Sequence, residues 1–247
     1  MLTIIGALII GLSLGLFGSG GSILTVPVLL YLLGQEPKIA IASSLLIVAG
    51  ISLLASLPNL RRGIISWRHV LFFGGAGMVG TYGGAWLGVL LPSWVQLTVF
   101  AVLMAIAAVL MWRKRTLDEA LAPQWRPGKV LLEGVVVGVI TGFVGVGGGF
   151  LIVPALVLLG GLSMTAAVAT SLVVIALKSV VGFAKYYYAL SASAVFDWQA
   201  IALMVVAGFI GSLVGRQVGK HIPTQPLQRA FAVFLLVMAA YVLWQSW

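Results

Sequence analysis

Charged residues are scarce in this sequence: Asp, Glu, Lys and Arg make up 8% of the 247 residues, against about 25% in ordinary globular domains. Hydrophobic residues reach 62%. A water-exposed surface cannot be built from so few charges, which excludes a soluble enzyme, a fibrous protein and a disordered chain. The composition predicts an all-α polytopic protein of the cell membrane, embedded in the lipid bilayer.

The chain has no cysteine, which excludes disulfides, thiolate metal sites and thiol nucleophiles. Its two histidines, His69 and His221, lie at segment ends without another ligand type at i+3 or i+4, so we expect no metal and no cofactor. The five acidic residues lie near segment ends or in loops. The 14 basic residues lie mostly at the ends of apolar runs, which indicates membrane orientation and no nucleic-acid partner.

Eight apolar segments approach or exceed the roughly 20 residues that a spanning helix needs. They are 2–33, 39–58, 69–91, 94–112, 130–160, 165–190, 198–220 and 227–247. The one long connection, 113–129, carries charged residues and divides the chain into 1–112 and 130–247. We expect it to be a cytoplasmic linker loop between two transmembrane repeats, each of four segments.

The two halves of the chain are similar in sequence. At an offset of 127, residues 15–21 (GLFGSGG) align with 142–148 (GFVGVGG), and Val26-Pro27 aligns with Val153-Pro154. At an offset of 131, a second block aligns the glycines at 80, 84 and 88 with those at 211, 215 and 219. Two blocks at nearly constant offset indicate an internal duplication, which is characteristic of transporter folds.

The first segment of each half is too long for one spanning helix, since 30 helical residues would extend about 45 Å across a hydrocarbon core of about 30 Å. Pro27 and Pro154 follow glycine clusters in these segments and lack a backbone N–H. We predict that each segment is a discontinuous or re-entrant pair of half-helices that meet near mid-membrane. The clustered glycines are Gly18, Gly20 and Gly21 in the first half, and Gly145, Gly147, Gly148 and Gly149 in the second.

Unwound backbone at such a break presents free N–H groups, and the following helix adds the positive end of its dipole. Two breaks that face each other at the repeat interface would bind a small anion. The alternative is that the glycines only allow close helix packing. Hydroxyl groups early in the next helices would either complete the coordination or cap and join helices. These residues are Ser43, Ser44, Thr170 and Ser171.

At these residues the sequence resembles the TauE/SafE family of membrane permeases, the sulfite exporters. The resemblance rests on the two glycine motifs with their Val-Pro pairs and on residues 42–44 (ASS) and 169–171 (ATS), and it extends over essentially the whole chain. It implies a carrier of sulfite, sulfonates or related small organic anions in a bacterial-type inner membrane. The first motif has Ser19 and Ser22 where the second has Val146 and Gly149, so the two half-sites are unequal.

Lys178 lies midway along its apolar segment, where an ionisable residue is costly and is a functional candidate by default. It would compensate the substrate's charge or change protonation during transport. The alternatives are a lysine that snorkels from a tilted helix or one end of a structural ion pair. Tyr186, Tyr187 and Tyr188 are interpreted as interfacial belt residues, and Asn59 as a loop residue.

The segments are consistent with two membrane topologies. If all eight segments span the membrane, nine Lys and Arg lie on the cytoplasmic side and four outside. If the two broken segments are re-entrant, the repeats are inverted, with eleven inside and two outside. The positive-inside rule favours the inverted layout by this small margin.

We therefore expect a secondary transporter that exports or exchanges a small sulfur-containing anion. H⁺ or Na⁺ is the coupling ion to consider, and a homodimer remains open. Alternative functions are a passive anion channel and a carrier of another small organic anion. A membrane-embedded enzyme would need His and carboxylates spaced on a mid-membrane helix, and the sequence offers none.

Overall fold

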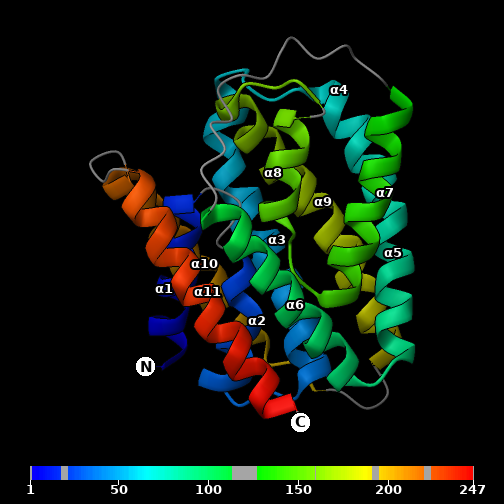
Figure 1. The fold of residues 1–247 in the computed structure, drawn as a ribbon, viewed down its shortest axis with the longest axis vertical. Helices are drawn as coiled ribbons and strands as arrows, with labels where there is room; N and C mark the ends of the chain where they lie inside the picture. Colours follow the sequence, from blue (N-terminus) through cyan, green and yellow to red (C-terminus); the bar gives the residue numbers. More distant parts are fainter. Residues whose placement is uncertain are drawn as a thin grey trace.

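The computed structural model describes residues 2–17, 22–112, 127–158, 160–190, 195–219 and 224–246. These residues contain helices and no strands, which confirms the all-α class (Figure 1). The first half comprises α1 (Leu2–Phe17), α2 (Thr25–Pro27) with the π-helix η2 (Val28–Leu32), α3 (Pro37–Arg61), α4 (Trp67–His69) with the π-helix η3 (Val70–Gly74), α5 (Gly75–Leu90) and α6 (Ser93–Trp112). The second comprises α7 (Pro127–Val144), α8 (Gly149–Leu158), α9 (Met164–Leu190), α10 (Trp198–Gly219) and α11 (Thr224–Ser246).

Six helical stretches of the described residues are long and apolar enough to cross a membrane, so the chain is a multi-pass membrane protein. They are Pro37–Arg61, Trp67–Leu90, Ser93–Leu110, Pro127–Val144, Met164–Leu190 and Trp198–Gly219. The protein itself buries 72% of the α3 window and 61% of the α9 window, against 33–44% for the other four. α3 and α9 therefore form the centre of the bundle, and the others present a large apolar surface to lipid.

Local sequence signals mark several helix boundaries. Pro37 is the first residue of α3, a position that needs no backbone N–H, and the Asp197 carboxylate accepts the Ala200 N–H at 2.9 Å at the start of α10. The expectation that Asn59 lies in a loop is wrong, because α3 continues through Pro58 to Arg61. An internal proline removes one helical hydrogen bond without ending a helix that is held by packing.

The predicted linker 113–129 overlaps the start of α7, because Pro127, Gly128 and Lys129 form the first turn of that helix. Residues 113–126 lie outside the described residues.

Two pairs of helices pack through glycine at backbone contact: α5 on α7, and α1 on α10. A Cβ on Gly84 would overlap Val139 O, and one on Gly80 would overlap Val135 O. Residue numbers rise together along both partners, so α5 and α7 are parallel. At the corresponding positions of the other pair, a Cβ on Gly215 would overlap Leu12 O, and one on Gly211 would lie 2.9 Å from Leu8 O. The same contact pattern therefore occurs twice.

The central helices α3 and α9 run antiparallel. Leu45, in the first half of α3, lies beside Gly182, in the second half of α9, where a Cβ would be 3.1 Å from Leu45 Cδ1. At the other end, the Ser66 N–H, which follows α3, donates to Thr170 Oγ1 at 3.0 Å, early in α9. Figure 1 shows the two helices crossing in the middle of the bundle.

Replacing Gly84 by alanine is expected to destabilise the fold by about 1–3 kcal/mol, because the new methyl group has no room against α7. The matched control is its neighbour Gly83, where a Cβ would meet nothing within 4 Å. Gly83→Ala should be neutral or stabilise by up to about 1 kcal/mol, since alanine favours helix. Thermal unfolding of both variants in detergent measures the difference, and equal losses would contradict the close α5–α7 packing.

Candidate functional site

The chain breaks between α7 and α8 in a four-residue stretch, 145–148, whose first and last positions adopt a conformation that favours glycine. Gly145 has φ +76° and Gly148 has φ +73°, both in the left-handed region. Thr141 O accepts the N–H groups of Gly145 and Val146 at 3.0 and 3.2 Å, and Gly148 O accepts those of Leu151 and Ile152. The N–H groups of Gly147 and Gly148 donate to no described residue.

The two arms of this break are unequal in length, which corrects the expectation of two half-helices. α7 has 18 residues and α8 has 10, which correspond to about 27 Å and 15 Å of helix. Gly134, Gly138 and Gly142 do not interrupt α7, because each packs its bare backbone against the η3–α5 helix. α1 is likewise long, with 16 residues. The second half thus has one long arm and one short arm that returns (Figure 1).

Lys178 of α9 places its ammonium group against this break. The side chain is 1% exposed, and its Nζ donates to Thr141 Oγ1 at 2.5 Å. A Cβ on Gly148 would lie 3.2 Å from the same nitrogen. No carboxylate of the described residues forms an ion pair with Lys178. A buried positive charge without a counter-charge is costly in a membrane protein, and an anion at the break would compensate it.

Thr141 was not predicted from the sequence, yet it links the lysine to the break. Its hydroxyl accepts from Lys178 and donates to Val137 O at 2.8 Å, which orients its lone pairs toward the ammonium group. The available signal was weak: a hydroxyl residue in an apolar run, one turn before a glycine cluster. Its partner lies 37 positions away.

The four predicted hydroxyl residues have different hydrogen-bond partners. Ser44 reaches Gly145 O and Ile41 O, the latter at 2.7 Å, so α3 contacts the break directly. The Ser43 hydroxyl is fully buried and has no hydrogen-bond partner among the described residues. Thr170 is engaged by Ser66, and Ser171 bonds Val168 O at 2.8 Å, within its own helix.

Of the predicted site residues, the structure brings together at the second break Gly145, Gly147, Gly148, Gly149, Ser44 and Lys178. Ser22 of the first half also approaches, since its Cβ would lie 3.4 Å from a Cβ on Gly147. Gly18, Ser19, Gly20 and Gly21 lie outside the described residues.

A buried polar cluster holds the last turn of α7 in front of the break. Gln96 Nε2 donates to Phe143 O at 2.6 Å and to the Tyr186 hydroxyl at 2.7 Å, and that hydroxyl donates to Phe143 O at 3.1 Å. The expectation that Tyr186 belongs to an interfacial belt is wrong, because its side chain is 0% exposed. It lies on the same face of α9 as Lys178 and Gly182, four residues apart, and that face packs inward.

The far end of the short arm is held by His69. Its Nε2 lies 3.0 Å from Gly160 O, which follows α8, and its Nδ1 lies 2.7 Å from Ser66 Oγ. Both ring nitrogens therefore contact protein groups. Lys38 holds a helix end at the opposite end of the molecule. Its Nζ donates to Val89 O at 3.0 Å and Leu91 O at 2.6 Å and so caps the C-terminus of α5.

Comparison with known proteins gives matches along nearly the whole chain. The family described as sulfite exporter TauE/SafE matches residues 3–242. A probable membrane transporter protein of Xylella fastidiosa is 31% identical over 254 residues, which cover 97% of this chain and 93% of the relative. Further probable membrane transporter proteins match from Bacillus subtilis, at 26% identity over 100% and 97% of the two chains, and from Methanocaldococcus jannaschii, at 25% over 98% and 94%. No solved structure was found to match. The chain therefore belongs to the TauE/SafE sulfite exporter family of membrane transporters.

Proposed function

We propose that this protein is a secondary transporter that moves a small sulfur-containing anion, such as sulfite, sulfoacetate or a related organosulfonate, out of the cell by alternating access. The observation that carries the proposal is the buried Lys178 ammonium group at the α7–α8 break, which has no carboxylate partner among the described residues. Sulfite and sulfonate groups carry several acceptor oxygens around a negative charge. That shape suits an ammonium group flanked by backbone N–H donors.

The donors would act together. Lys178 supplies charge, and the Gly147 and Gly148 N–H groups supply short-range donors. The start of α8 adds the positive end of a helix dipole. Ser43, with its unpartnered hydroxyl, is the candidate on α3 to complete the coordination, and Ser44 positions the Gly145 carbonyl beside it. We place Thr170 and Ser171 at the other half-site, because they correspond to Ser43 and Ser44 at the sequence offset of 127.

The second half-site would be the first glycine motif, residues 18–21. Two facts support an inverted repeat: the glycine contacts of α5 on α7 recur at corresponding positions of α1 on α10, and the corresponding helices α3 and α9 run antiparallel. Inverted repeats around a midplane site open alternately to the two sides. Arg61, Arg62, Arg68 and Lys129 share the end where α3 ends and α4 and α7 begin, which the positive-inside rule assigns to the cytoplasm.

Alternating access also needs states in which the site is open. Lys178 is 1% exposed, so the charged site is closed to solvent in this structure. The glycine contacts provide surfaces without side chains along which α7 can shift on α5 and α1 on α10. Either movement would carry one arm of a break relative to α3 and α9.

The test is counterflow in proteoliposomes with radiolabelled sulfite. Uptake should saturate with concentration and be stimulated by unlabelled sulfite or sulfoacetate on the opposite side, but not by chloride. Applied H⁺ and Na⁺ gradients identify the coupling ion. Flux that neither saturates nor responds to the opposite side would indicate a channel, and absence of flux for every sulfur anion would refute the substrate class.

A further inference from the structure

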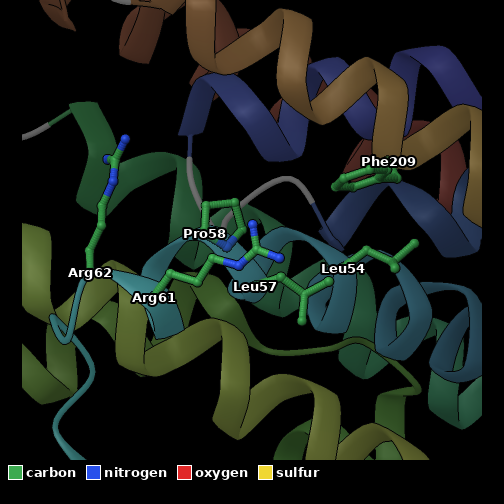
Figure 2. Close-up of a pocket in the computed structure, with 6 residues that line it drawn as sticks. All are labelled: Leu54, Leu57, Pro58, Arg61, Arg62 and Phe209. Atoms are coloured by element: carbon green, nitrogen blue, oxygen red, sulfur yellow. The ribbon is translucent and has the colours of Figure 1, made fainter.

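A hollow of about 340 Å³ lies between α3 and α10, at the end of the bundle that carries the arginines. Figure 2 shows the side chains that line it: Leu54, Leu57, Pro58, Arg61, Arg62 and Phe209. It lies several turns along α3 from Ser44, so it is separate from the α7–α8 break.

The hollow combines unpaired positive charge with an apolar wall. The guanidinium groups of Arg61 and Arg62 form no ion pair or hydrogen bond with the described residues. In Figure 2, the Arg61 side chain extends over the hollow beside Pro58, whereas Arg62 points away from it. Leu57 is 47% exposed, and Leu54 and Phe209 are half-buried. An anion with an apolar tail is complementary to this combination.

Pro58 adds a polar feature to the wall. Because proline has no N–H, the Leu54 carbonyl does not receive the helical hydrogen bond from residue 58. That oxygen therefore lacks one helical donor, and a hydroxyl group of a ligand would suit it.

The corresponding residues of the second half differ. By the sequence offset of 127, Arg61 and Arg62 correspond to Tyr188 and Ala189, and Pro58 corresponds to Lys185. Lys185 lies 5.1 Å from the centre of the Tyr82 ring, in a cation–π contact. The paired arginines are thus confined to the end that the positive-inside rule assigns to the cytoplasm, where anionic lipid headgroups accumulate.

We infer that this hollow binds an anionic phospholipid of the cytoplasmic leaflet. Its phosphate would lie at Arg61, with Arg62 adding longer-range attraction, and one acyl chain would lie along Leu54, Leu57 and Phe209. Basic pockets between transmembrane helices are typical sites for anionic headgroups. Because α3 contacts the break and α10 packs on α1, a bound lipid would tie together two elements against which α1 is proposed to move.

The experiment measures lipid binding to the purified full-length protein by native mass spectrometry and thermal unfolding. Phosphatidylglycerol should bind and raise the melting temperature more than phosphatidylcholine with identical acyl chains. The affinity should fall about 5-fold in Arg61→Gln and about 30-fold in the Arg61→Gln/Arg62→Gln variant. The matched control is Arg229→Gln, an exposed arginine on α11 outside the hollow, which should retain binding.

Several outcomes would overturn the inference. Equal binding of the two lipids, or unchanged binding in the double variant, would show that the arginines select no headgroup. An equal loss in Arg229→Gln would indicate general charge attraction. Glycerol phosphate, which has no acyl chain, and sulfite are tested in the same assay. If either raises the melting temperature as much as phosphatidylglycerol through Arg61, the hollow recognises a soluble anion rather than a lipid.

Discussion

Replacing Lys178 by methionine is expected to reduce sulfite counterflow by about 30-fold or more while the protein stays folded. Methionine has a similar length and suits a buried apolar environment, so the variant loses the ammonium group without leaving a large cavity. A bound anion would then lie at the break without its counter-charge, and a buried charge that loses its partner costs about 2–5 kcal/mol. The melting temperature should be unchanged or higher, since an unpaired buried charge is removed.

Lys185→Met is the matched control, because Lys185 lies on the same helix but contacts the Tyr82 ring instead of the break. It should transport at nearly the original rate. Lys178→Arg keeps the charge but introduces a larger, planar group against Thr141 and Gly148, so we expect weaker transport with retained anion selectivity. Full counterflow in Lys178→Met would show that the lysine is structural and would remove the main support for the anion site.

The sequence identified Lys178 because its depth in an apolar segment is visible without a structure. An ionisable residue at that position is costly wherever the helix packs. Its partner was hidden, because Thr141 is 37 positions away and nothing local shows that α7 and α9 meet there. The same limit applies to Gln96 and Tyr186, which converge on Phe143 O from different helices.

Tyr186 shows how a local pattern misled. Three consecutive tyrosines near a segment end resemble an aromatic belt, and Tyr188, 80% exposed, has the exposure of a belt residue. Consecutive helical residues point in directions about 100° apart, so the three cannot share one environment. The four-residue spacing from Lys178 through Gly182 to Tyr186 was the usable signal, because it places the tyrosine on the buried face of α9.

The glycines in and after α7 have two different roles. The break was predicted at the glycine cluster from Gly145 to Gly149. Gly134, Gly138 and Gly142, earlier in the same segment, stay helical because the η3–α5 helix packs directly on their backbone. The break follows where two glycines adopt positive φ, at Gly145 and Gly148. Clustering was the usable signal, because the glycines that pack are spaced four residues apart along α7, whereas those that turn lie close together.

That distinction gives the second prediction: Gly148→Ala should destabilise the protein by roughly 2–5 kcal/mol and abolish transport. Two costs add. A left-handed conformation costs alanine about 1–2 kcal/mol, and the new Cβ would overlap Thr141 Cγ2 and lie 3.2 Å from Lys178 Nζ, where overpacking costs about 1–3 kcal/mol. Thermal unfolding and counterflow measure both effects.

Gly34→Ala separates the two costs, because Gly34 has φ +63° but a Cβ there would meet nothing within 4 Å. It should show the conformational cost alone and keep transport. Adding Thr141→Ser to Gly148→Ala removes the overlapping methyl group and keeps the hydroxyl that accepts from Lys178, so it should restore part of the stability. If Gly148→Ala is no worse than Gly34→Ala, the break does not pack against Thr141 and Lys178, and an anion held between them loses its geometric basis.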